Sequence, residues 1–152
     1  MPSQPIARLP TGPDDSVCQI WVVSDGTPGM RLQAVAMAES LLKVCPDWEY
    51  EQFTITPHRW IRALPRVAAA VPKIPLYDTA KDGMLDRRPH AGRYPHIMIT
   101  CGRRMAGYAL AMKRRARADG FDMQIVHLQD PRLPPHLFDA MIVPAHDRIR
   151  GS

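Results

Sequence analysis

The sequence holds 152 residues with a formal net charge of +5, and its 45% hydrophobic and 23% charged residues are ordinary for a globular protein. These proportions exclude a disordered or fibrous chain, and no apolar run approaches the roughly 18 residues that would cross a bilayer. Three widely spaced cysteines without a CxxC pair argue against a disulfide framework or a structural zinc site. We therefore expect a cytoplasmic protein that is at most peripheral to the inner membrane.

The first third of the chain predicts a strand, a helix and a second strand. Residues 1–16 are rich in proline and are expected to form a disordered arm. The apolar run CQIWVVS at 18–24 is typical of a strand buried on both faces of a parallel sheet. Apolar residues then recur at helical spacing over 31–44, until Pro46 ends the helix. WEYEQFT at 48–54 alternates large apolar with polar residues, which favours a strand nearer the sheet edge.

The remaining residues continue this alternation. A short helix is predicted over 59–71, followed by a long connection at 72–95 without a sustained period. The later predicted elements are a buried strand at 96–100 (HIMIT), a helix at 105–118 and strands at 121–128 and 138–143. This order predicts an α/β fold with a Rossmann-like open parallel sheet flanked by helices, in a single domain over 17–152.

The loop DGTPGM, between the first strand and the first helix, has the composition of an anion-binding turn. Gly26 and Gly29 permit positive φ and a close approach of the backbone, and Pro28 is tolerated in a first helical turn. The free N–H groups at the start of the helix would face an anion. The alternative is a tight strand-to-helix turn that binds no ligand.

CGRRM, after the strand HIMIT, repeats this arrangement with more positive charge. Gly102 can open the helix, while Arg103 and Arg104 can hold a diphosphate or a carboxylate near the positive end of its dipole. Cys101 shares these surroundings, which would lower its pKa and favour a thiolate nucleophile. A plain buried cysteine at a strand end is the alternative.

Other strand ends supply candidate bases and anion ligands. His146 follows the last predicted strand, where Asp147 would orient its imidazole as a general base; a polar pair that stabilises the loop is the alternative. Asp25 is the second candidate base, and its side chain would equally cap the first helix. In QDPR, Asp130 can accept hydrogen bonds and Arg132 can bind phosphate or carboxylate, or the segment is a proline turn braced by an ion pair.

In a doubly wound sheet, ligands bind beyond the carboxyl ends of the strands, where the strand order reverses. We therefore expect the turns around Gly26, Gly102 and His146 to converge on one cleft. Basic residues also gather between Arg103 and Arg117 without an acid among them, but no aromatic platform or nucleic-acid motif accompanies them. We expect no nucleic-acid partner; a solvated helix face and a contact with phosphate or lipid headgroups both stay open.

Three segments are similar, in order and spacing, to bacterial relatives of the plant elongated-mitochondria fission protein family. They are IWVVSDGTPGMRLQAVAMAESL, PHIMITCGRRMAGYALAMKRR and MQIVHLQDPRLPPHLFDAMIVPAHDRIRG. The shared pattern is D-G-x-x-G-x-x-x-Q, which ends at Gln33, then C-G-R-R, then Q-D-P-R…F-D…P-x-H-D. The resemblance covers residues 20–151.

This resemblance implies a two-Rossmann-domain fold of the B-type glycosyltransferases, of which the chain resembles only the N-terminal, acceptor-binding half. The implied ligands are a nucleotide sugar or a phosphate-bearing acceptor, with an anionic membrane surface and a second polypeptide that completes the fold as further partners; no cofactor and no metal is expected. Asp25 or His146 would deprotonate the acceptor hydroxyl. The implied ligand-binding residues are Gly26, Gly29, Gln33, Gly102, Arg103, Arg104, Asp130, Arg132 and Asp147.

Two other functions stay open. A non-catalytic membrane or protein adaptor would use the basic helix at 113–117. An NAD-type nucleotide-sugar epimerase would have Ser24 where the dinucleotide fingerprint has its first glycine, and Glu49 or Glu51 as its ribose ligand. Because half of the implied fold lies outside this sequence, catalysis by this chain alone is not expected.

Overall fold

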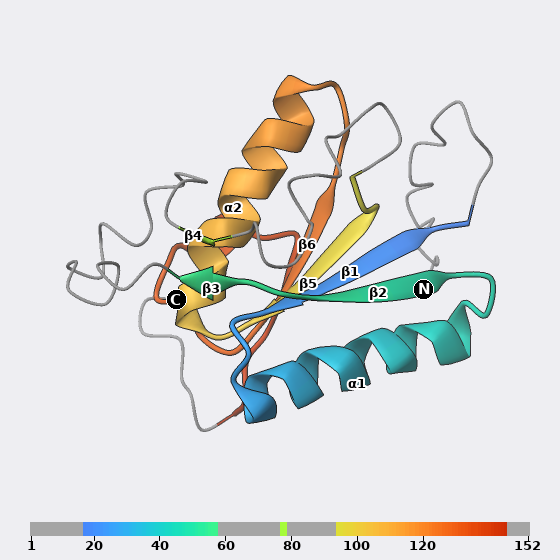
Figure 1. Cartoon of the computed structure of the whole chain (residues 1–152), viewed down its shortest axis with the longest axis horizontal. Coiled ribbons are helices and arrows are strands. Elements are labelled where there is room, and N and C mark those ends of the chain that lie inside the picture. The colour runs from blue at the N-terminus through green and yellow to red at the C-terminus, as the bar shows by residue number, and fades with distance from the viewer. Residues whose placement is uncertain (1–16, 58–76, 79–93, 146–152) are drawn as a thin grey trace, which may run out of the picture.

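The computed structural model describes residues 17–57, 77–78 and 94–145. Figure 1 shows an open sheet with one long helix on each side. The elements are β1 (Gln19–Ser24), α1 (Pro28–Val44), β2 (Glu49–Thr54), β3 (Thr56–Pro57), β4 (Tyr77–Asp78), β5 (Ile97–Cys101), α2 (Arg103–Ala118), β6 (Gln124–Leu128), a 3-10 helix (Pro135–Leu137) and β7 (Ala140–Ile142).

The main sheet is parallel throughout, in the order β2-β1-β5-β6-β7. The chain moves from β1 to β2, returns to the other side of β1 as β5, and continues outward through β6 to β7. Because parallel crossovers are right-handed, this reversal places α1 and α2 on opposite faces (Figure 1). The carboxyl ends of β1 and β5 therefore form the topological switch point of a doubly wound sheet.

Small residues hold α1 against its face of the sheet. Ala34 and Ala38 are the buried residues of this helix, and they pack against Ile20, Val22 and Ile99. Alanine lets the helix backbone approach the strands, while each fully buried aliphatic side chain contributes roughly 1.5–3 kcal/mol. The alternating side chains of β1 thus serve both faces, as the continuous apolar run predicts.

The opposite face holds the larger apolar cluster. Met105 and Ala109 of α2 pack there with Val23, Met98 and Ile125 from three neighbouring strands. Nine of the sixteen residues of α2 are buried, compared with two of the seventeen in α1. The α2 face is therefore the main core of the described residues.

The structure confirms the predicted α/β class and all five predicted strands of the parallel sheet. Both helices begin earlier than their apolar periodicity predicts, α1 at Pro28 and α2 at Arg103. Proline suits a first helical turn because its φ is already helical and its missing N–H would have no partner there. The last connection, between β6 and β7, contains a 3-10 helix (Pro135–Leu137) where the β1–β2 and β5–β6 crossovers contain α1 and α2.

Other predictions fall on residues that the structure does not describe. The arm at 1–16, the helix at 59–71 and the final segment from His146 lie outside the described ranges. Of the predicted long connection at 72–95, Tyr77–Asp78 forms β4 and pairs antiparallel with β3. Among the described helices, none is long and apolar enough to cross a membrane.

Candidate functional site

The first two predicted turns meet at the switch point. Asp25 directly follows β1, and Arg104 is the second residue of α2. The Nη1 atom of Arg104 lies 3.7 Å from Oδ2 of Asp25, with the Asp25 side chain 10% exposed and the Arg104 side chain 56% exposed. The guanidinium of Arg104 thus faces the Asp25 carboxylate in a long and partly solvated ion pair. We use "the switch point" below for residues 25–27 and 102–104.

The first loop is held by its own aspartate. Oδ1 of Asp25 accepts a hydrogen bond of 3.0 Å from the Thr27 N–H, so its side chain closes the turn that leads into α1. Gly26 has φ of +84° and its N–H lies 3.4 Å from Oγ of Ser24. Thr27 is the N-cap residue but makes no side-chain capping bond. Asp25 thus combines the turn role of Oδ1 with a second carboxylate oxygen, Oδ2, that faces Arg104.

The structure contradicts the expected positive φ and close backbone approach at Gly29, whereas its ligand-binding role stays a prediction. Its φ is not positive, because Gly29 already lies in the first turn of α1, and a Cβ added there would meet no atom within 4 Å. Neither left-handed backbone nor close packing demands glycine at this position. What Gly29 and Met30 contribute is backbone N–H groups that have no acceptor among the described residues, as expected at a helix start.

The second loop requires glycine on two grounds. Gly102 has φ of +87°, and a Cβ added there would lie 2.6 Å from Sδ of Met30. Its N–H donates to the Leu128 carbonyl at 3.1 Å, which ties this loop to the end of β6. Arg103 and Arg104 then open α2, whose first turn contains no acid. The loop is therefore positively charged and fixed against its neighbours on both sides.

Cys101 is a buried thiol rather than an activated one. Burial raises its pKa from the ordinary 9.0 to about 11, and the negative charge of Asp25 adds to this effect. Its Sγ lies 3.7 Å from Sδ of Met30 and 3.6 Å from Oε1 of Gln33. The alternative of a plain strand-end cysteine therefore describes Cys101 better than a thiolate nucleophile does.

The QDPR segment lies beside these loops, at the end of β6. Gln129 and Arg132 both have positive φ, of +74° and +55°. Oδ1 of Asp130 accepts the Arg132 N–H at 2.8 Å, so a side-chain-to-backbone hydrogen bond braces this turn. Nε2 of Gln129 donates to Oε1 of Gln33 at 3.2 Å, which connects α1 to the β6 loop. Gln33 was a predicted ligand residue, whereas Gln129, the first residue of QDPR, was given no ligand role.

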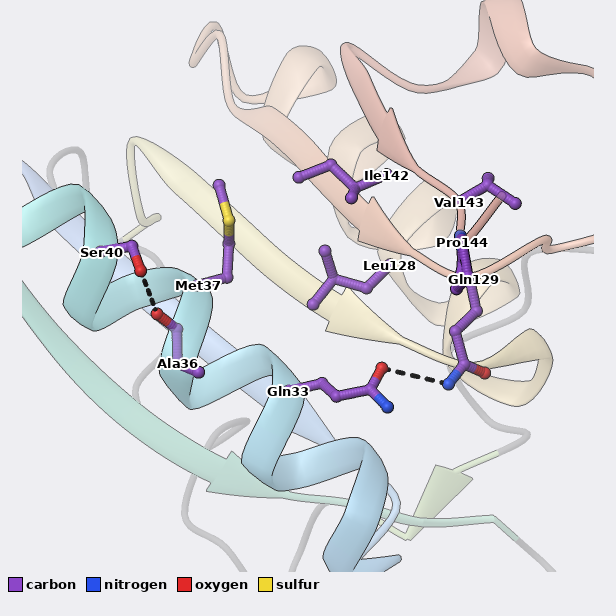
Figure 2. Close-up of a pocket in the computed structure, with 9 residues that line it drawn as sticks. All are labelled: Gln33, Ala36, Met37, Ser40, Leu128, Gln129, Ile142, Val143 and Pro144. Atoms are coloured by element: carbon purple, nitrogen blue, oxygen red, sulfur yellow. Dashed lines mark hydrogen bonds between the residues drawn. The ribbon is translucent and has the colours of Figure 1, made fainter. Parts of the chain in front are cut away.

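An open pocket of about 390 Å³ lies between α1 and the ends of β6 and β7. We call it the α1/β7 pocket. Figure 2 shows Met37, Leu128 and Ile142 pointing toward this space, with the Gln33–Gln129 hydrogen bond at one end. The complete lining is Gln33, Ala36, Met37, Ser40, Leu128, Gln129, Ile142, Val143 and Pro144. Apart from Gln33, sequence reasoning missed this site, because it depends on where α1 lies relative to β7.

A buried polar pair, His127 and Thr100, lies under α2 rather than at the switch point. His127 is fully buried, with Nδ1 2.8 Å from Oγ1 of Thr100, and its Nε2 has no hydrogen-bond partner within the described ranges. Burial lowers the pKa of the His127 imidazole to about 4, although the negative charge of Asp130 opposes this shift. The ring is therefore neutral at ordinary pH. It stacks near Phe138, at 5.1 Å between ring centroids, and serves the core.

Internal partners engage part of the basic helix. Nζ of Lys113 forms a short contact with Asp139, whose Oδ2 also accepts the Ile125 N–H at 2.7 Å. Arg115 lies close enough to Tyr94 to lower that residue's pKa, although burial and Asp119 raise it overall to about 12. Arg114 and Arg117 remain exposed. Fewer basic side chains of α2 are therefore available to an external partner than the sequence implies.

The third predicted turn falls outside the described residues. His146 and Asp147 belong to the final segment, so their convergence with the first two turns stays a prediction. Within the described ranges, no group of three His, Cys, Asp or Glu side chains has the arrangement of a metal site.

Comparison with known proteins assigns the chain to a protein family. A family model described as "Mitochondrial fission ELM1" matches residues 28–152, which include α1 and the whole CGRR loop but begin after Asp25. The chain is 29% identical over 128 residues to the uncharacterized protein RP120 of Rickettsia prowazekii (strain Madrid E). That match covers 84% of this chain and 32% of the Rickettsia protein, so the chain spans about a third of the length of the curated relative. No solved structure matches the chain.

Proposed function

The chain belongs to the mitochondrial fission ELM1 family, and we propose that it is the acceptor-binding half of a glycosyltransferase that uses a nucleotide sugar. The proposed acceptor carries both a hydroxyl and a phosphate group. The rest of a full-length protein, or a second polypeptide, binds the nucleotide. The family membership supports the comparison with bacterial relatives, and the chemistry of the switch point supports the role of this half.

The observation that carries the proposal is the approach of Arg104 to Asp25 across the reversal of strand order. A guanidinium can bind phosphate through two parallel hydrogen bonds, and the first-turn N–H groups of a helix add to that attraction. Arg104 and Arg103 begin α2, where both contributions act on the same anion. The neighbouring carboxylate of Asp25 supplies an acceptor for a proton at the same place.

In the proposed reaction, the acceptor hydroxyl attacks the anomeric carbon of the donor sugar and passes its proton to the Asp25 carboxylate. The bond from that carbon to the diphosphate breaks, and the nucleoside diphosphate leaves with the bonding electrons. A phosphate on the acceptor takes the place of Asp25 beside Arg104, which frees the carboxylate for proton transfer. The resting pair is long, at 3.7 Å, and its arginine is half exposed, so the pair itself adds little to stability.

The other two functions receive less support. Glu51 lies in the middle of β2, in register with Trp21, rather than at the strand end where a ribose ligand would stand. Lys113 of the basic helix is paired with Asp139. Vesicle sedimentation tests the adaptor directly: binding to anionic vesicles that is lost in the double variant Arg114→Ala and Arg117→Ala would favour it.

The proposal is tested by calorimetric titration with sn-glycerol 3-phosphate, a small molecule that carries both a hydroxyl and a phosphate. Arg104→Ala should weaken binding about tenfold or more, because a charge-assisted hydrogen bond is worth about 1.5–3 kcal/mol. Arg117→Ala is the matched control, since it removes an exposed arginine from the other end of α2. Equal affinities of the two variants would refute the proposal.

A further inference from the structure

We propose that the α1/β7 pocket binds the aliphatic chain of a lipid phosphate whose headgroup occupies the switch point. This inference rests on the proposed function, because it assigns a class of molecule to the acceptor. The inference adds the α1/β7 pocket as a second binding site, separate from the two loops of the switch point. The acceptor is then amphipathic, with its reacting hydroxyl near its phosphate and its hydrocarbon between α1 and β7.

The lining of the pocket fits hydrocarbon. Met37, Leu128, Ile142 and Val143 supply apolar side chains, and among the described residues no charged one lines the pocket. Its volume of about 390 Å³ lies within the range of roughly 300–1,000 Å³ that is usual for small-molecule sites. The polar lining is confined to two glutamines and one serine, which can orient a ligand but cannot balance a charge in the pocket.

The described part of the chain does not fully cover the sheet face beside α1. Parallel sheets normally bury both faces, yet Ile142 in β7 is 46% exposed on the face where Leu128 and Met37 meet. Hydrocarbon that enters this space removes apolar surface of both partners from water. The pocket therefore offers an apolar group a favourable binding site next to the polar site at the switch point.

Gln33 connects the pocket to the switch point. It lines the pocket, and its Oε1 lies 3.6 Å from Sγ of Cys101, the residue that directly precedes Gly102. The same oxygen accepts the hydrogen bond from Gln129, as Figure 2 shows. A ligand that extends from Arg104 into the pocket passes these two amides, which can bind oxygens near its phosphate. Continuity with the positive end of α2 thus favours a lipid phosphate over an uncharged lipid.

A homologous series of alkyl phosphates tests this inference, with butyl, hexyl and octyl phosphate titrated below their critical micelle concentrations. Each methylene that enters the pocket should raise affinity by up to about fourfold, which corresponds to about 0.8 kcal/mol per buried methylene. Ile142→Asp should abolish the dependence on chain length while leaving inorganic phosphate binding unchanged. Leu32→Asp is the matched control, because Leu32 is an exposed apolar residue of α1 outside the pocket and its change should leave the series intact.

The outcomes separate this inference from the function on which it rests. If phosphate binds through Arg104 but chain length has no effect, the lipid inference fails and the proposed function stands. If chain length matters while Arg104→Ala changes nothing, the pocket is an isolated apolar site and the proposal of a bridging ligand fails. If Ile142→Asp instead abolishes self-association in sedimentation experiments without affecting alkyl phosphates, the pocket is a polypeptide-docking surface and the inference is also overturned.

Discussion

The Sδ atom of Met30 occupies the space where a side chain at residue 102 would begin, 2.6 Å from the position of a Cβ atom there. Met30 lies in the first turn of α1, and Gly102 is the N-cap residue of α2. This contact packs the two helix starts against each other at the switch point. The distance between the loop after β1 and the loop after β5 therefore depends on Gly102 and on the Met30 side chain.

Replacing Gly102 by alanine should lower the free energy of unfolding by about 2–4 kcal/mol, since left-handed strain and a steric clash both contribute. Gly120→Ala is the control: Gly120 also has positive φ but open space around it, and should lose only about 1 kcal/mol. Urea unfolding measures both. In a double-mutant cycle, Met30→Ala should restore the part of the free energy of unfolding that Gly102→Ala loses through the steric clash. Equal losses for the two glycine variants would show that the clash is relieved without cost.

The buried His127 should make the fold sensitive to acid. Its pKa is about 4 in the folded protein and about 6.5 in the unfolded chain, so the unfolded state takes up a proton first. The contribution of His127 to the free energy of unfolding is therefore fully present above about pH 6.5. It decreases as the pH falls from about 6.5 to 4 and changes no further below that, with a total loss of about 3 kcal/mol. The double variant His127→Phe with Thr100→Val should flatten that part of the pH profile of unfolding.

Asp139 should matter more to stability than its partner Lys113. Its carboxylate accepts the Ile125 N–H of the β6 segment and also contacts Lys113, so Asp139→Ala leaves a partly buried backbone donor unsatisfied. We expect a loss of about 1–3 kcal/mol for Asp139→Ala and less than about 1 kcal/mol for Lys113→Ala, whose ion pair is partly solvated. Thermal unfolding of both variants checks the order. A larger loss for Lys113→Ala would mean that the ion pair, not the hydrogen bond, holds this loop.

The thiol of Cys101 should be inert. With its pKa raised by burial from 9.0 to about 11, the thiolate fraction near neutral pH is about a hundredfold lower than in an exposed cysteine. Iodoacetamide labelling followed by mass spectrometry should leave Cys101 unmodified in the folded protein and label it in urea. Cys101→Ser should bind sn-glycerol 3-phosphate as the parent chain does. Rapid labelling of the native thiol would revive its assignment as a nucleophile.

Much of the fold follows from local patterns in the sequence. The uninterrupted apolar runs of β1 and β5 predict strands covered on both faces, and the turn residues behind them predict where ligands could bind. The contact between Asp25 and Arg104 agrees with the predicted meeting of the first two loops. The positive φ that the sequence allowed at Gly26 is found there, and Gly102, directly after β5, has positive φ as well.

Other features depend on how elements pack, which local patterns do not contain. Gly29 resembles Gly26 in the sequence, but the helix begins at Pro28 and already includes it. The α1/β7 pocket arises because the short β7 extends the sheet beyond the reach of α1, so no single segment carries its signal. His127 occupies a strand position that polar residues often take at a surface, and only the cover of α2 and Phe138 makes it part of the core.

The most direct test of the account is an amide chemical-shift titration of the ¹⁵N-labelled protein with sn-glycerol 3-phosphate. The central claim is that the turns after β1 and β5 form one phosphate-binding site. It predicts saturable shifts at the amides of residues 26–27, 29–31 and 102–105 with a common dissociation constant, and their loss in Arg104→Ala. Shifts confined to one of the two turns, or spread over the exposed arginines at the far end of α2, would contradict it.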